Sequence, residues 1–271
     1  MIAYVLCAGF GTRMRPLTDE TPKSLLPVGG RPILDRLLEN LRPWSALDAV
    51  HVVVNHRHAP QFEQWADDWK SERTDADTSL TVHDDGVRSP DEQLGAVGDL
   101  EFLLTETGMP QDGALVTGGD SLYRFPVAPI LESFTGAPPR VLALYEPDPR
   151  KRAHSSVLQL DGSHVTGLVE NPDAAASERI CPSFHLLSPG ALERVEPYLN
   201  AGGDPDTLGT FIDGLAQRQR VEAVRLPLCP SLRLHCNTPE DLRHARTVLD
   251  DEPRHVLDEA AVRECLPEND R

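Results

Sequence analysis

Strand-like and helix-like segments alternate along the first half of this chain, and that order limits the folds open to it. After Pro32, apolar residues recur with the 3.6-residue period of a helix face, whereas Val50–Val54 is a continuous apolar run typical of a buried strand. The predicted strands are Ile2–Leu6, Val50–Val54, Ser79–Val82, Ala114–Thr117 and Val141–Tyr145, and the predicted helices are the one after Pro32, Gln61–Lys70, Leu94–Thr105, Val127–Phe134 and Pro239–Leu249. This order predicts an α/β protein whose mostly parallel sheet has helices on both faces.

The second half of the chain carries weaker signals. From about Val157 the segments shorten and prolines become frequent, which we interpret as an α/β excursion on the same sheet. No internal repeat and no linker-like composition divides the chain. We therefore expect residues 1–249 to form a single domain and residues 250–271 to form a polar tail with helical character.

Composition excludes several classes of protein. The 19 glycines and 24 prolines among 271 residues fall short of the share that marks low-complexity disorder. No apolar run approaches the roughly 18 residues of a membrane helix, and residues 1–8 are too short and uncharged for a signal peptide. The five cysteines form no C-x-x-C pair, so neither a zinc site nor a disulfide framework is expected. We expect a soluble cytoplasmic protein with no membrane partner.

The charge balance is unusual, with a formal net charge of −17 and only three lysines among 26 basic residues. Such acidity opposes binding to nucleic acid or acidic membranes, because both carry the same sign. A lysine-poor acidic surface is typical of proteins adapted to high internal salt, where screening reduces the repulsion among carboxylates. A GC-rich genome would also favour arginine over lysine, so both explanations stay open.

Residues 6–32 form the most informative stretch, in which a predicted strand runs into a loop. The loop brings together two glycines, a hydroxyl and two cations: Gly9, Gly11, Thr12, Arg13 and Lys23. Glycines let backbone N–H groups approach an anion closely, and the hydroxyl and cationic side chains add directed donors. The loop is therefore a candidate anion-binding site, although two glycines alone can also form a simple strand-to-helix turn.

Common nucleotide-binding motifs do not describe this loop, because Pro22 and Met14 stand where a Walker A loop and a dinucleotide fingerprint need glycine. The stretch instead resembles the signature loop of the sugar-1-phosphate nucleotidylyltransferases, G-x-G-T-R-x-x-P-L-T-x-x-x-P-K-x-L-x-P. Eleven positions fit that signature, namely Gly9, Gly11, Thr12, Arg13, Pro16, Leu17, Thr18, Pro22, Lys23, Leu25 and Pro27. The order of elements agrees over roughly residues 1–245, while the similarity of motifs weakens after about residue 125.

The resemblance implies a Rossmann-like three-layer α/β sandwich and an enzyme that joins a nucleoside triphosphate to a sugar 1-phosphate, with release of pyrophosphate. It implies that Arg13, Lys23 and Asp120 act in catalysis. Asp120 would also hold Mg²⁺, since a carboxylate at a strand end suits a hard cation, although it could simply form a turn. Residues 84–100 resemble the family's base-recognition loop, with a plain helix start as the alternative. The implied nucleotide-binding residues are Ala8, Gly9, Gly11, Thr12, Arg13, Lys23, Gln93 and Gly95.

Three positions in the second half depart from the family pattern. Glu170 matches the family's E-K-P motif, but Asn171 stands where the sugar-phosphate lysine is expected. Ser183 replaces a glycine whose backbone contacts the sugar, and His235 replaces a second metal-binding aspartate. Imidazole suits Mn²⁺ or Zn²⁺ better than Mg²⁺, so a packing or surface role for His235 stays open. The candidates for binding the acceptor are therefore Glu170, Asn171 and Ser183, and the candidates for binding the metal are Asp120 and His235.

Two functions follow from these residues. The first is Mg²⁺-dependent transfer of a nucleotidyl group from a nucleoside triphosphate to a sugar 1-phosphate, or to another phosphorylated acceptor held by Arg150, Lys151 or Arg152. Cytidylyl transfer to a non-sugar phosphate belongs to the same class. The alternative is a catalytically impaired protein that binds nucleotides or sugar nucleotides. The base, the acceptor and the oligomeric state stay open.

Overall fold

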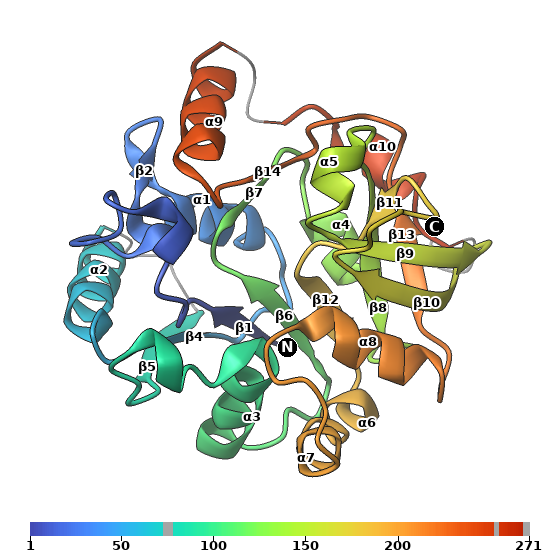
Figure 1. Ribbon diagram of the computed structural model, residues 1–271, viewed down its shortest axis with the longest axis horizontal. Coiled ribbons are helices and arrows are strands. Elements are labelled where there is room, and N and C mark those ends of the chain that lie inside the picture. The colour runs from blue at the N-terminus through green and yellow to red at the C-terminus, as the bar shows by residue number, and fades with distance from the viewer. Residues whose placement is uncertain (73–77, 252–254, 268–271) are drawn as a thin grey trace.

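The computed structural model describes residues 1–72, 78–251 and 255–267, and Figure 1 shows the arrangement of their elements. Within these residues lies a ten-stranded sheet with the order β11-β9-β10-β13-β8-β12-β6-β1-β4-β5. Its strands are β1 (Ile2–Leu6), β4 (Ala49–Val54), β5 (Ser79–Asp84), β6 (Ala114–Gly118), β8 (Arg140–Tyr145), β9 (Ser156–Asp161), β10 (His164–Glu170), β11 (Arg179–Ile180), β12 (Phe184–Leu187) and β13 (Glu222–Arg225).

The sheet is mixed. Its first part, formed by β5, β4, β1 and β6, is parallel throughout. β12 then lies antiparallel between β6 and β8, and β13 is parallel to β8. β9 and β10 are antiparallel because the turn at Gly162–Ser163 is too short for the crossover that a parallel pair needs. The predicted α/β class is confirmed, whereas the predicted mostly parallel arrangement holds only for the first part of the sheet.

Helices cover both faces of this sheet. Neighbouring residues of a strand point to opposite faces, so Val5 packs into one core cluster and Tyr4 into another. The Val5 cluster is closed by residues from α1 (Ile33–Leu41), α2 (Ala59–Ser71) and α4 (Ala128–Glu132). The Tyr4 cluster is closed by residues from α3 (Gly95–Thr107), α6 (Pro189–Leu192), α7 (Val195–Asn200) and α8 (Leu208–Ala216). No helix within the described ranges is long and apolar enough to cross a membrane.

The segment predicted as a polar tail contributes to the core. α9 (Pro239–Asp251) ends within this segment, and α10 (Glu259–Arg263) lies wholly inside it. Val262 and Leu266 are fully or almost fully buried in the cluster that α4 also joins. Residues 252–254 and 268–271 of the predicted tail lie outside the described residues.

A short antiparallel ribbon lies apart from the main sheet and positions the site described below. It pairs β7 (Ser121–Tyr123) with β14 (Arg233–His235). Its inner face carries Leu122 and Leu234, which pack into a small core together with residues of α1 and α9. A second ribbon pairs β2 (Pro27–Val28) with β3 (Arg31–Pro32) in the same region. Three-residue strands have no periodic signal, so the sequence does not predict the first ribbon.

Candidate active site

The carboxyl ends of two neighbouring parallel strands bring the predicted site residues together. Leu6 at the end of β1 lies in register with Gly118 at the end of β6. The loop that continues from β1 and the Gly119–Asp120 turn that continues from β6 therefore leave the sheet at one edge. Ligands of open α/β sheets bind at this kind of edge.

A charged cluster forms where these segments meet the β7–β14 ribbon. Lys23 Nζ lies 2.5 Å from Asp120 Oδ2 and donates a second hydrogen bond of 2.8 Å to Asn237 Oδ1. His235 Nε2 lies 3.1 Å from Asp120 Oδ2. The other ring nitrogen, His235 Nδ1, lies 3.3 Å from Asn237 Nδ2. Ser121 Oγ donates to the other carboxylate oxygen of Asp120. The structure thus joins three predicted residues, Lys23, Asp120 and His235, around one carboxylate.

Electrostatics keeps this carboxylate ionised. Burial acts to raise the pKa of Asp120, but the nearby Lys23 and His235 hold that pKa well below its ordinary value. Burial lowers the pKa of His235, and the neighbouring positive charge of Arg233 lowers it further. A neutral His235 beside an ionised Asp120 and a cationic Lys23 leaves the cluster without a net negative charge of its own.

The glycine loop presents its donors outward, as an anion-binding loop requires. Gly11 has a φ of +61°, and its carbonyl accepts a 2.7 Å hydrogen bond from Thr18 Oγ1 that fixes the turn. Thr12 and Arg13, in the short 3-10 turn η1 (Thr12–Met14), are both exposed. Within the described residues no hydrogen bond or ion pair engages the Arg13 side chain. Arg13 is therefore available to an incoming anion.

Two other predicted nucleotide-binding residues beside the glycine loop differ in exposure. Ala8 is 5% exposed, and its carbonyl accepts a hydrogen bond from Asn55. The Ala8 side chain is therefore buried, and only the backbone next to it belongs to the surface of the loop. Gly9 is exposed, and a Cβ at this position would meet nothing within 4 Å. The open space beside Gly9 suits a ligand that approaches the backbone, while Ala8 supports the turn from beneath.

The predicted base-recognition segment has a structural role that sequence did not indicate. A Cβ on Gly95 would overlap the carbonyl of Pro205, which also accepts a hydrogen bond from Val97 N. Gly95 therefore lets the start of α3 pack against the loop before α8, and its contact with a base stays a prediction. Gln93 is exposed and donates to the Pro90 carbonyl.

The sequence did not indicate a role for two acidic residues of this segment. Asp99, on α3, is 7% exposed and its Oδ1 has no hydrogen-bond partner within the described residues. Burial, with a contribution from Asp85, raises the pKa of Asp99 to about 7. Burial also raises the pKa of Asp85 to about 6. The only sequence signal for Asp99 is its place in the helical period. That period puts this acidic residue on the apolar inner face of α3, where a carboxyl group is unexpected.

The acceptor candidates divide into two places. Ser183 lies next to Gly118, and its carbonyl accepts hydrogen bonds from Gly118 N and Thr117 Oγ1, which places it beside Asp120. Glu170 and Asn171 instead lie at the end of β10. Glu170 Oε1 accepts a 2.6 Å hydrogen bond from Ser156, and burial raises the pKa of this carboxyl.

The backbone at the end of β10 explains two of the residue types found there. Asn171 has a φ of +45°, a conformation that asparagine adopts more readily than lysine. A Cβ on Gly209, in the first turn of α8, would overlap Glu170 Oε1. The glycine thus leaves room for the carboxylate to approach the helix.

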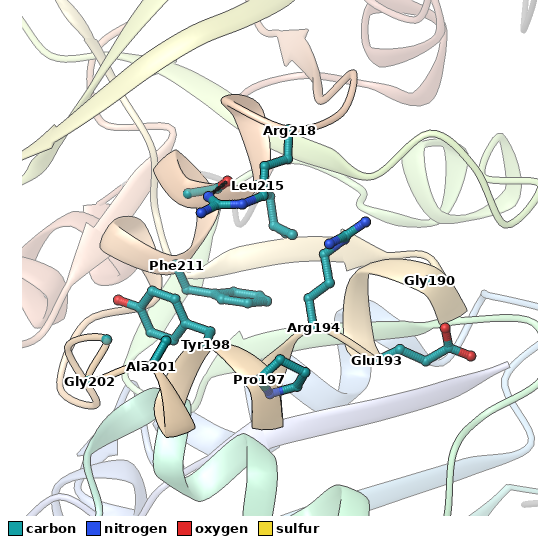
Figure 2. A pocket seen from close by; sticks show the side chains of 12 residues that line it. Gly190, Glu193, Arg194, Pro197, Tyr198, Ala201, Gly202, Phe211, Leu215 and Arg218 are labelled. Carbon is teal, nitrogen blue, oxygen red and sulfur yellow. Dashed lines mark hydrogen bonds between the residues drawn. The ribbon is translucent and has the colours of Figure 1, made fainter.

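A surface hollow between α6, α7 and α8 lies apart from this cluster. It has a volume of about 670 Å³, and Figure 2 shows the rings of Tyr198 and Phe211 with Arg194 and Arg218 at its sides. None of the predicted site residues lines it.

The side chains around Asp120 suit the predicted Mg²⁺ only in part. Among the described residues no three His, Cys, Asp or Glu side chains group in a way that could hold a metal ion. Mg²⁺ in phosphate-transfer sites is typically held by one or two carboxylates, with phosphate oxygens and water completing its shell. Asp120 fits that pattern, whereas His235 offers a nitrogen atom and is better suited to orient the carboxylate it contacts.

Comparison with known proteins identifies the chain's relatives. The family model described as nucleotidyl transferase matches residues 2–222. The chain belongs to the nucleotidyl transferase family. Mannose-1-phosphate guanyltransferase from Schizosaccharomyces pombe is 27% identical to this family member over 199 residues, which are 73% of this chain and 52% of that protein. Mannose-1-phosphate guanylyltransferase 1 from Arabidopsis thaliana is 27% identical over 202 residues, 72% of this chain and 52% of the relative. The chain thus spans about half the length of these curated relatives.

Solved structures share the fold of this chain. A protein from Bacillus anthracis assigned as a glucose-1-phosphate thymidylyltransferase, in complex with a sucrose, has a TM-score of 0.77 and 18% identity, covering 93% of this chain and 97% of its own. CTP:phosphocholine cytidylyltransferase from Streptococcus pneumoniae has a TM-score of 0.70 and 17% identity, covering 92% and 99%. At such identities the likeness establishes the α/β fold alone.

Proposed function

We propose that this chain transfers a nucleotidyl group from a nucleoside triphosphate to a sugar 1-phosphate and releases pyrophosphate. The observation that carries the proposal is the Lys23–Asp120 pair, held at 2.5 Å beside the exposed Thr12–Arg13 turn. A cation that pairs with a strand-end carboxylate close to a glycine loop suits a reaction in which phosphate charge is rearranged. The family match and the guanylyltransferase relatives support the same chemistry.

The proposed reaction needs no protein nucleophile. An oxygen of the acceptor phosphate attacks the α-phosphorus, the bond to the bridging oxygen of the β-phosphate breaks, and pyrophosphate leaves with that electron pair. Arg13 and Lys23 bind the triphosphate and neutralise charge that develops in the transition state. Asp120 would hold the Mg²⁺, which when bound neutralises phosphate charge. His235 and Ser121 orient the Asp120 carboxylate through their contacts with its two oxygens.

The finer predictions about the chain's organisation belong to the same proposal. Residues 1–249 would act as one nucleotidyltransferase domain, and the helices on the two sheet faces suit a Rossmann-like three-layer sandwich. The glycine loop, Gln93 and Gly95 would hold the nucleotide, and Glu170, Asn171 and Ser183 would lie around the acceptor. A cytoplasmic location, where nucleoside triphosphates are available, suits this activity.

A second candidate is a binding protein that has lost turnover. The observation in its favour is that His235, which replaces an expected carboxylate, occupies one oxygen of Asp120. Calorimetry distinguishes the two functions, because the second candidate binds a nucleoside triphosphate without consuming it.

The proposal is tested by measuring pyrophosphate release from the four common nucleoside triphosphates, paired with a panel of sugar 1-phosphates and phosphocholine. Arg13→Ala is expected to lose most of the activity. Arg15→Ala is the matched control, because Arg15 is exposed in the same loop and, among the described residues, pairs only with Asp19. Equal rates in both variants would remove Arg13 from the site.

A further inference from the structure

The outer face of strand β14 forms a row of accessible polar side chains. Arg233, His235 and Asn237 are partly exposed, whereas the residues that alternate with them, Leu232, Leu234 and Cys236, are 2%, 5% and 0% exposed. Alternation with a period of two places Arg233 and His235 on one face of the strand, and Asn237 follows two residues after the strand ends. Two of them already belong to the charged cluster, since His235 contacts Asp120 and Asn237 contacts Lys23. Arg233 is the third member of that row.

The ribbon register places Arg233 on the acceptor side of the cluster. Arg233 pairs with Tyr123 across the ribbon, two residues along from the pair formed by His235 and Ser121. The Tyr123 hydroxyl donates to the carbonyl of Ser183, the acceptor candidate that lies beside Asp120. The positive charge of Arg233 also reaches Tyr123, Cys181 and His235. Arg233 therefore lies within electrostatic reach of both Ser183 and the Asp120 cluster.

Arg233, like Arg13, is a cation near the cluster that has no ion pair with a described residue. Within the described residues its guanidinium has no hydrogen bond and no ion pair, although the chain carries 43 acidic residues. Leaving a partly buried guanidinium unpaired is costly, and its planar fork of donors matches a phosphate group.

Two of the three other cations considered for this role are engaged elsewhere, and the third, Lys151, is exposed to solvent. Arg150 binds its own neighbour Asp148 at 2.9 Å, and Arg152 donates to the carbonyls of Glu146 and Pro147. Asn171, at the position expected to carry the sugar-phosphate lysine, has no charge. Arg233 is therefore the better candidate for the missing charge.

We propose that Arg233 binds the phosphate group of the acceptor and supplies the charge that Asn171 lacks. This inference rests on the proposed function and deepens it, since it assigns an acceptor-phosphate contact to β14. It makes the acceptor a phosphomonoester that enters between the ribbon and Ser183.

The test compares Arg233→Ala and Arg233→Lys with the control Arg243→Ala. The Arg243 side chain is exposed on α9, and its one ion pair within the part of the chain that the structure describes is with Glu240. Calorimetric binding of α-D-mannose 1-phosphate and α-D-glucose 1-phosphate is measured first, followed by KM for the acceptor and for the nucleoside triphosphate. Loss of one charge-assisted contact should weaken acceptor binding about ten- to a hundredfold in Arg233→Ala. Arg233→Lys should recover part of that loss, and KM for the triphosphate should stay within about twofold of wild type.

The outcomes separate this inference from the proposed function. Weakened sugar-phosphate binding in Arg233→Ala without pyrophosphate release by wild type supports the role of Arg233 and contradicts the proposed function. Pyrophosphate release with an unchanged acceptor KM in Arg233→Ala overturns the role of Arg233 alone. Equal losses for both substrates, with a lowered melting temperature in Arg233→Ala and Arg233→Lys, indicate a structural role and also overturn it. Failure of wild type to bind either sugar phosphate overturns it as well.

Discussion

Lys23 and Asp120 are separated by 97 residues, and the fold brings Nζ and Oδ2 to 2.5 Å. Their side chains are only 20% and 22% exposed, so the pair is partly withdrawn from solvent. The carboxylate proposed to hold Mg²⁺ is thus already neutralised by the lysine proposed to bind the triphosphate. Substrate binding must therefore redistribute the contacts of both residues.

Asp120→Asn should abolish metal-dependent turnover while nucleotide binding persists. The amide keeps the size of the side chain but loses the charge that attracts the metal. Pyrophosphate release and calorimetric nucleotide binding measure the two effects separately. Asp112→Asn, an exposed change in the loop before β6, should leave both unchanged. Full activity in Asp120→Asn would remove this residue from the metal site.

Lys23→Ala and Arg13→Ala should both impair use of the triphosphate, but only the first should destabilise the protein. Arg13 is exposed, whereas the Lys23 side chain is only 20% exposed and is paired with Asp120. Removing Lys23 leaves a partly buried carboxylate short of its main partner, which should lower the free energy of unfolding by about 1–3 kcal/mol. The double variant Lys23→Ala/Asp120→Asn should recover part of this loss. Additive losses in denaturant unfolding would contradict a coupled pair.

Asp99→Asn should stabilise the protein, and more so at pH 8 than at pH 5. The folded protein keeps the Asp99 proton up to a pKa of about 7, mainly because of burial, whereas the unfolded chain releases it near 3.8. Stability is therefore lost as pH rises between these values, and the penalty is complete above the folded pKa. The extra gain at pH 8 should be about 2 kcal/mol. Glu106→Gln, an exposed change on the same helix, is the control, and equal gains at both pH values would contradict the account.

Thermal stability should rise with KCl concentration. At a net charge of −17, screening relieves repulsion among surface carboxylates. The same screening weakens phosphate binding, but a partly closed site is screened less than the open surface. Activity should therefore be higher at molar KCl than near 0.1 M. Melting curves and initial rates across a KCl series check both effects, and a flat or falling melting temperature would rule out an adaptation to salt.

The sequence was sufficient where local pattern and packing agree. The predicted strand Ile2–Leu6 matches β1 at both ends, because this strand is buried inside the sheet between β6 and β4. The alternation that follows predicts the parallel half correctly. The β7–β14 ribbon could not be predicted, since strands of three residues have no period to detect.

The site was predictable in its parts but not in its contacts. Fixed spacing indicated Lys23 and Asp120, but nothing local relates residues 97 positions apart. Asn237 and Arg233 were missed because their significance depends on which face of β14 meets the cluster. The alternation of apolar and polar residues over 232–237 indicates that face only after the structure has shown that β14 is a strand. The base contact of Gly95 stays a prediction from the resemblance, whereas its close approach to Pro205 could not be inferred from sequence.

The most direct test of the central claim is a pyrophosphate-release assay with purified protein, Mg²⁺ and every pairing of the four common nucleoside triphosphates with a panel of sugar 1-phosphates and phosphocholine. The account predicts release that needs both substrates and the metal, forms the matching sugar nucleotide, and is lost in Asp120→Asn. No release above background in any pairing, from folded protein that still binds a nucleoside triphosphate, would contradict it.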